Sequence, residues 1–140
     1  MKKAITILTV ILVILLGFTF RQSQAFASLT NWFAPDMKFE VEIYDFDRLD
    51  SGDLAGYYFH YTNTGRSKLK IQDISTACGC TVVDWNSRPL SPGESDSLYI
   101  TYDTNLLGYF TKEIVVNSNS STSPDRIYIK GMVDRPKELK

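Results

Sequence analysis

Apolar and polar residues alternate with a period of two along most of the chain after residue 38. Such alternation is typical of β-strands that bury one face. Short clusters of Gly, Pro, Asn, Asp and Ser separate the runs and indicate turns. Five of the predicted strands are marked by their apolar residues, and two by continuous runs. The marking residues are Phe39, Val41 and Ile43; Tyr57, Phe59 and Tyr61; Leu69, Ile71 and Ile74; Leu98, Ile100 and Tyr102; and Ile127 and Ile129 with Met132 or Val133. The two runs are a short strand over 81–85 and a β-rich stretch over 110–116.

About seven such strands follow one another with no amphipathic helix between them, a pattern of all-β proteins. We therefore predict an immunoglobulin-like antiparallel β-sandwich. Pro92-Gly93 fits the centre of a type II turn. Asn63-Thr64-Gly65 is predicted as another turn, in which glycine supplies a positive φ. Residues 117–125 are too polar for the core and predict a loop.

The first 27 residues follow a different pattern. Two lysines precede an apolar run over residues 4–20, and Ala25-Phe26-Ala27 has the small-any-small form that a signal peptidase recognises. Together these features predict a helical signal peptide cleaved between Ala27 and Ser28. An uncleaved anchor is the alternative, since about 17 apolar residues lie at the lower limit for spanning a bilayer.

These patterns divide the chain into a signal peptide (1–27), a lead-in segment (28–37), a sandwich domain (38–134) and a charged tail (135–140). The expected location is the periplasm, the cell envelope or the extracellular space. Cleavage would leave 12 basic and 16 acidic side chains, a net charge of -4. That charge argues against nucleic acid as a partner, because phosphate binding needs a basic surface. Membrane contact is expected only through an uncleaved signal segment.

The chain has two cysteines, Cys78 and Cys80, on either side of Gly79 in a predicted loop between strands. One interpretation is two packed thiols on a turn whose shape Gly79 dictates. A second is a strained, reducible disulfide, since an extended backbone would hold the two Cα atoms roughly 6–7 Å apart and must fold in at Gly79. A third is Cu(I) held by both thiolates. Export to an oxidising compartment argues against free thiols.

Other chemistry has little support in the sequence. Structural zinc needs four ligands, and His60 is the one histidine, predicted on the exposed face of its strand. No nucleophile, base and acid can be assembled into a catalytic set. The acidic stretch over residues 45–53 does not match a calcium loop, because bulky side chains stand between its carboxylates. We therefore expect no enzyme and no cofactor, with Cu(I) at Cys78 and Cys80 as the one exception considered.

Six short segments form a combined pattern: residues 57–65, 77–81 with Trp85, 92–95, 102–104, 108–112 and 127–131. In their order and spacing these segments resemble the bacterial exported family called domain of unknown function 1573. That family is itself similar to immunoglobulin-like modules of the ASH/hydin type. The family usually has serine before its Cys-Gly-Cys, where this chain has Ala77. The resemblance implies an immunoglobulin-like fold and no established function.

Two functions are therefore predicted. The first is an exported, non-enzymatic immunoglobulin-like module that binds a protein or an envelope component, for which strand addition to a sheet edge is a known mode. The alternative is a thiol-redox or Cu(I)-binding protein that acts through Cys78 and Cys80.

Overall fold

The computed structural model describes residues 11–14 and 32–136. The chain falls into two compact units, residues 1–33 and residues 34–140. Within the first unit, residues 11–14 are helical. No helix in the described part of the chain is long and apolar enough to cross a bilayer. Most of the predicted signal peptide and its cleavage site lie outside the described residues.

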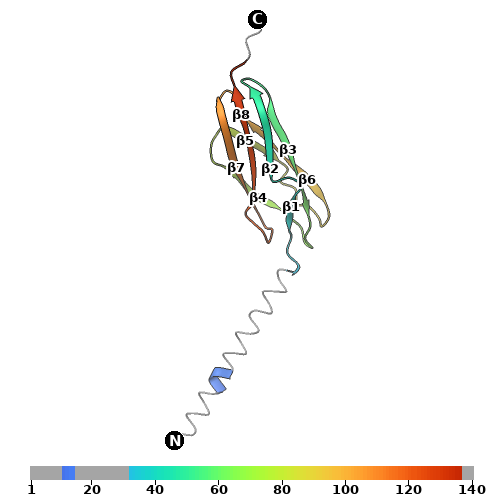
Figure 1. Ribbon diagram of the computed structural model, residues 1–140. Coiled ribbons are helices and arrows are strands. Elements are labelled where there is room, and N and C mark those ends of the chain that lie inside the picture. The colour runs from blue at the N-terminus through green and yellow to red at the C-terminus, as the bar shows by residue number, and fades with distance from the viewer. Residues whose placement is uncertain (1–10, 15–31, 137–140) are drawn as a thin grey trace. The chain divides into compact units, whose positions relative to one another are not determined.

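Eight strands form two four-stranded sheets packed face to face (Figure 1). Sheet A has the order β1-β3-β6-β5 and sheet B the order β2-β8-β7-β4. These orders match the A-B-E-D and C-F-G sheets of an immunoglobulin-like sandwich, with β2 added beside β8. The predicted fold class is confirmed, with one strand more than expected. The strands are β1 (Met37–Phe39), β2 (Ile43–Asp50), β3 (Ala55–Asn63), β4 (Ile71–Thr76), β5 (Thr81–Trp85), β6 (Ser95–Tyr102), β7 (Gly108–Ser118) and β8 (Asp125–Asp134).

The first predicted strand is in fact two strands in different sheets. The chain leaves sheet A after Phe39 and joins sheet B at Ile43, where β2 runs parallel to β8. The prediction that Val41 and Ile43 are buried is wrong, since they are 38% and 56% exposed. Tyr44 packs against the core instead. The reason is the change of sheet, which reverses the face that the alternating side chains turn inward.

Aromatic side chains connect the two sheets. Tyr44 of β2 stacks on Tyr57 of β3 with ring centroids 3.6 Å apart, and Tyr102 of β6 stacks on Phe110 of β7 at 3.7 Å. Stacked pairs of this kind add specific geometry to the area they bury. The predicted stripe at Tyr57, Phe59 and Tyr61 is confirmed as core. Burial, followed by the charge of Asp96, raises the pKa of Tyr61 to about 12.

The third predicted strand is shorter than its apolar pattern suggested. Leu69 lies outside β4 and forms an isolated bridge with Leu90, with both side chains buried. Within β4 the register with β7 shifts between Ile71 and Asp73. The shift explains how Ile71 and Ile74, three residues apart, both turn toward the core. The predicted loop over 117–125 is also shorter, because β7 and β8 extend into it.

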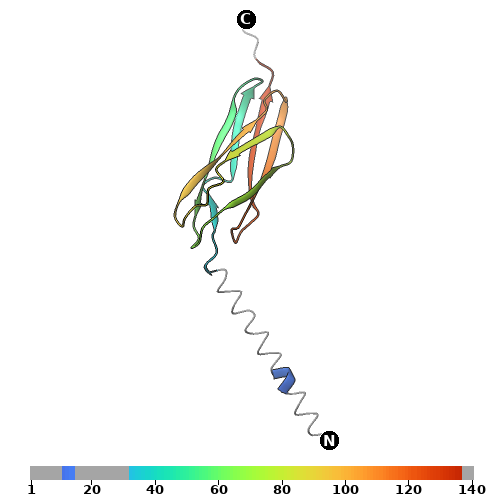
Figure 2. The same cartoon turned by 180° about the vertical axis from the view of Figure 1, so that it is seen from behind.

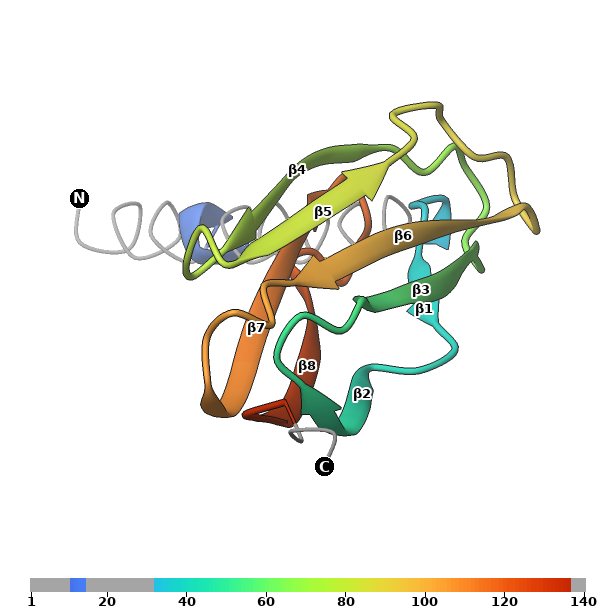
Figure 3. The same cartoon turned by 90° about the horizontal axis from the view of Figure 1, so that it is seen from above.

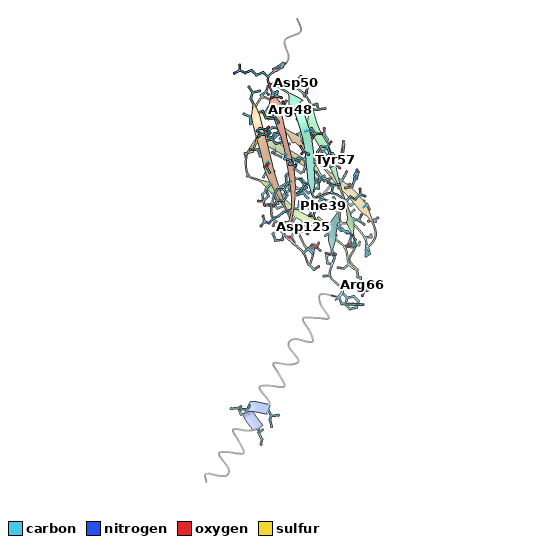
Figure 4. All side chains as sticks on the ribbon, viewed as in Figure 1. Phe39, Arg48, Asp50, Tyr57, Arg66 and Asp125 are labelled. Atoms are coloured by element: carbon cyan, nitrogen blue, oxygen red, sulfur yellow. A yellow bond between two sulfur atoms is a disulfide. The ribbon has the colours of Figure 1, made fainter. Side chains whose placement is uncertain are left out.

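The end of the domain at which the chain enters, here called the proximal end, is held by the turn after β3. Asn63 is fully buried, and its Nδ2 donates to the carbonyl oxygens of Ser67 (2.8 Å) and Leu90 (3.0 Å). The Thr64 N–H donates to the Asp36 carbonyl at 2.9 Å, so this turn grips the segment that leads into β1. Figure 4 shows Arg66 at this end and Arg48 and Asp50 at the opposite, distal end.

Gly65 is required here for a reason other than the predicted one. Its φ is not positive, in contrast to those of Gly52 and Gly93. A Cβ on Gly65 would instead overlap backbone atoms of Pro35 and Asp36. The turn therefore needs glycine because two backbone segments approach each other closely.

One acidic side chain at the proximal end opposes folding at neutral pH. Burial raises the pKa of Asp125, and the nearby carboxylates of Asp36 and Glu42 add to the effect. Its Oδ2 is buried without a hydrogen-bond partner. A pKa that is higher in the folded than in the unfolded state means that stability falls as the pH rises through the interval between the two values.

We expect Asp125→Asn to raise the free energy of unfolding at pH 7, by less than about 1 kcal/mol because the group is partly solvated. The free energies of unfolding of the variant and the native chain should converge at pH values below the pKa that the carboxyl group has in the unfolded state. Urea titrations at pH 7 and pH 3.5 measure both differences. A variant that is less stable at pH 7 would contradict the expectation.

Candidate functional site

The cysteine loop, residues 77–80, connects β4 to β5 and contains a disulfide between Cys78 and Cys80. The two Cα atoms are 5.3 Å apart, less than an extended backbone would give. Both cysteine side chains are half-buried, whereas Ala77 and Gly79 are exposed. The bridge thus closes a small ring at the surface and does not join the two sheets through the core.

Backbone and hydroxyl contacts fix the loop at both of its ends. The Thr76 hydroxyl donates to the Cys78 carbonyl at 3.1 Å. The Asp103 N–H, just after β6, donates to the Cys80 carbonyl at 3.0 Å. Cys80 also packs against the core, and its Sγ lies 4.0 Å from the Thr81 hydroxyl. The second cysteine is therefore held by the sandwich more firmly than the first.

Gly79 does not have the predicted role in shaping the turn. Its φ lies outside the left-handed region, and no atom outside residues 78–80 lies within 4 Å of the place where a Cβ would stand. An alanine could take this conformation and would meet free space. Neither backbone geometry nor packing accounts for glycine at this position.

Metal binding at the cysteine loop stays a prediction. Cu(I) would need two thiolates, and in this structure both sulfurs belong to the disulfide. No group of three or more His, Cys, Asp or Glu side chains placed to hold a metal occurs among the described residues. His60 lies on the outer face of sheet A, opposite Ser97 of β6 and away from the core.

A shallow hollow of about 630 Å³ lies on the outer face of sheet B, where β2 bulges. It includes two of the acidic side chains considered for calcium, Asp45 and Asp47. Asp45 pairs with Lys130 at 3.0 Å, and Arg48 pairs with Asp134 at 2.8 Å. The Asp47 N–H, with Lys130, holds the pKa of Asp45 below its ordinary value. These two ion pairs neutralise most of the charge around the hollow.

Four strands form the edges of the sheets, and three of them carry features that discourage pairing with another chain. β1 has only three residues. β2 contains a bulge between Asp45 and Arg48, with Asp47 at a φ of 54°. β4 has the register shift between Ile71 and Asp73.

The fourth edge strand, β5, lacks these features. It pairs with β6 without a break from Thr81 to Trp85, and its sequence Thr-Val-Val-Asp-Trp contains one charge and no proline or lysine. Val82 points outward and is 63% exposed. Figures 2 and 3 show β5 beside β6, with no further described strand of sheet A beyond it. β5 is the edge at which a partner strand would meet least opposition.

A second hollow, of about 280 Å³, lies beside β5 on the outer face of sheet A. Tyr58 and Tyr99 form one side of it, with ring centroids 4.4 Å apart, and Asp84 and Asp96 supply carboxylates. None of its lining residues is basic. These two tyrosines were not predicted as site residues, because the alternating pattern was used to find only the side chains that face the core. Their outward-facing positions in β3 and β6 are the sequence feature that could have identified them.

Solved structures with the same fold come from different organisms. A protein of unknown function from Porphyromonas gingivalis W83 is 20% identical with a TM-score of 0.66, and the match covers 76% of this chain and 50% of that one. An ASH/PapD-like domain of human CEP192 is 12% identical with a TM-score of 0.62, and the match covers 74% of this chain and 89% of that one. A match to the CsuC–CsuE chaperone–tip adhesion subunit pre-assembly complex of Acinetobacter baumannii is 14% identical with a TM-score of 0.51. It covers 70% of this chain and 57% of that one.

The chain spans half the length of the Porphyromonas protein, and identities this low show the fold alone. No sequence among curated proteins matches the chain at a significant level. The family profile described as "protein of unknown function (DUF1573)" matches residues 37–133, which include the whole sandwich from β1 to Val133 of β8. The chain belongs to the DUF1573 family.

Proposed function

We propose that this protein is an exported, non-enzymatic binding module that holds an extended segment of another protein against the edge of β5. The observation that carries the proposal is the unprotected state of that edge, since the other three edge strands are short, bulged or irregular in register. Export follows from the basic start, the apolar run and the Ala25-Phe26-Ala27 site of the sequence. The expected location is the bacterial cell envelope.

The backbone of β5 supplies the main interaction in this proposal. In an antiparallel edge strand, alternate residues direct their N–H and C=O groups away from the sheet, and an incoming strand satisfies them. Val82 and Asp84 would flank the outward side chains of that strand. Side chains on the outer face then select which segment binds, while backbone hydrogen bonds give most of the affinity.

The charges beside β5 indicate a basic partner segment. Asp84 and Asp96 line the hollow without a basic neighbour among its lining residues, and the rings of Tyr58 and Tyr99 lie next to them. A lysine or arginine of the partner strand would gain both carboxylate contacts and cation–π contacts here. An anionic polymer would be repelled.

The fold comparisons are compatible with this function and do not extend it. The Acinetobacter structure contains a chaperone of similar fold in a pre-assembly complex with a tip adhesion subunit. A sandwich of this kind can therefore hold another protein.

The proposal can be tested by photocrosslinking in the bacterium that makes the protein. A benzoylphenylalanine at Val82 is expected to give discrete protein adducts, because that side chain borders the vacant strand position. The matched control is the same residue at Ile43, which is similarly exposed on β2, an edge strand with a bulge. Adducts should be detected by blotting and identified by mass spectrometry.

The charge argument is tested in the same experiment. Asp84→Lys in the chain that carries the probe at Val82 should abolish most of the adduct, because a lysine would repel a basic segment. Lys38→Asp, an outward residue of β1, is the control for a change of charge on the same face. Equal adducts at both probe positions, or none at Val82, would refute binding at the β5 edge.

A further inference from the structure

The cysteine loop has a combination of features that strand addition at β5 does not explain. Its disulfide joins residues only two apart, so it constrains very little of the unfolded chain. It lies at the surface of the distal end and contacts the core only through Cys80. A bridge placed in this way contributes little to holding the sandwich together.

The residue between the cysteines adds no side chain beside the bridge. Gly79 is exposed, has no atom outside residues 78–80 within 4 Å of a Cβ position and does not need a glycine conformation. Ala77, on the other side of Cys78, is small and exposed as well. The backbone between the two cysteines therefore carries no side chain that could stand over the sulfur atoms.

We propose that the Cys78–Cys80 disulfide is a site of thiol–disulfide exchange with a protein dithiol, whose reactive thiol reaches the bridge over Gly79. This inference is independent of binding at the β5 edge, and either can fail without the other. The partner is defined by its chemistry: two cysteines able to form a disulfide of their own, one of them an exposed thiolate.

The exchange proceeds in two balanced steps. The partner thiolate attacks the Sγ of Cys78, forming a mixed disulfide and releasing the Cys80 sulfur as a thiolate, which takes up a proton. The second thiol of the partner loses its proton and attacks the partner's own sulfur in the mixed disulfide, which releases Cys78 as a thiolate that is then protonated. Two electrons pass from the partner to the cysteine pair, which takes up one proton from the partner's second thiol and one from solvent, and the partner ends as a disulfide.

The structure indicates why Cys78 is the sulfur attacked. Cys80 packs against the core and directly precedes β5, so approach to its Sγ is restricted on that side. After release, the Cys80 sulfur remains close to the Thr81 hydroxyl, which is 4.0 Å away in the bridged state. Cys78 lies between the two small exposed residues and makes no such contact with the core cluster.

The test compares a protein dithiol with a small one on the full chain. Reduced thioredoxin and dithiothreitol are each mixed with the chain, the reaction is stopped by alkylation, and reduction of the cysteine pair is measured by mass spectrometry. Both reagents should reduce the native bridge, thioredoxin faster at equal dithiol concentration. Gly79→Val should slow thioredoxin about tenfold and dithiothreitol less than about threefold, because only the protein must dock over the loop.

Ser87→Val, at an exposed position in the segment after β5, is the matched control and should change neither rate. Gly79→Ala replaces the valine variant if valine lowers the melting temperature, and it should lower the thioredoxin-to-dithiothreitol rate ratio in the same direction. Rapid alkylation with a thioredoxin that lacks its second cysteine should trap the mixed disulfide on Cys78, with the label on Cys80. An unchanged rate ratio in a folded Gly79 variant overturns the proposal, and trapping on Cys80 overturns the assignment of the attacked sulfur.

Discussion

Asn63→Ala is expected to lower the free energy of unfolding by about 3 kcal/mol, because it removes the hydrogen bonds that a fully buried amide makes to three backbone groups. The side chain is fully buried. Its Nδ2 donates to the carbonyl oxygens of Ser67 and Leu90, and its Oδ1 accepts from the Gly65 N–H at 3.1 Å. Loss of these contacts loosens both the turn after β3 and the segment around Leu90.

The measurement is a guanidinium titration monitored by tryptophan fluorescence, with the slope checked for two-state behaviour. Asn86→Ala is the matched control: that side chain is exposed and its Oδ1 accepts one hydrogen bond, from the Arg88 N–H at 2.9 Å. The control should cost less than about 1 kcal/mol. A similar loss in both variants would show that burial of Asn63 does not matter to stability.

Gly65→Ala is expected to be as damaging, by about 3 kcal/mol or more, through steric overlap with backbone. An added Cβ would stand within 3.0 Å of the Asp36 nitrogen, the Pro35 Cα and the Ala34 carbonyl oxygen. These are main-chain atoms, so no side-chain rotation can relieve the overlap. The Thr64 and Arg66 N–H groups, which donate to Asp36 and Ala34, would have to move away from their acceptors.

Gly79→Ala is the matched control for this substitution, because neither glycine has a positive φ and Gly79 has free space around it. Its effect on thermal stability should be within about 0.5 kcal/mol, as for a surface change. Equal destabilisation by the two alanines would contradict the steric argument. The control also supplies the folded variant needed to study exchange at the cysteine loop.

The fold could be predicted because period-two alternation reports directly on burial in a sheet. Phe59, Leu98, Ile100, Ile127 and Ile129 are all buried as that pattern requires. Pro92-Gly93 behaves as expected too: Gly93 has a φ of 81° and the Glu94 N–H donates to the Ser91 carbonyl. These features depend on residues that are close together in the sequence, so the sequence alone is enough to predict them.

Long-range features could not be predicted in the same way. The alternation from Phe39 to Tyr44 continues across the change of sheet, so nothing local shows that the buried face reverses. Gly65 was predicted to supply a positive φ, but its need for glycine comes from residues almost thirty positions earlier. Local rules assign a glycine to a turn and cannot detect the approach of a distant backbone.

Only part of the candidate site could be predicted from the sequence. Cys78 and Cys80 are the two cysteines of the chain, and the sequence is compatible with three interpretations of their bonding. The β5 edge could not be recognised, because whether a strand lies at an edge depends on sheet order, which alternation does not encode. The same limit hid Tyr58 and Tyr99 as a pair, since they come from strands whose pairing was unknown.

The grip of the turn after β3 on residues 34–36 also has a mechanical consequence. Tension arriving from the N-terminal side must pass through this grip and then along β1, whose short ladder with β3 is loaded in shear. Several hydrogen bonds then share the load and do not open one after another. If the N-terminal side is anchored and a partner is bound to β5, the load crosses sheet A from β1 through β3 and β6 to β5. The unbroken pairings of β3 with β6 and of β5 with β6 then carry the force between anchor and partner.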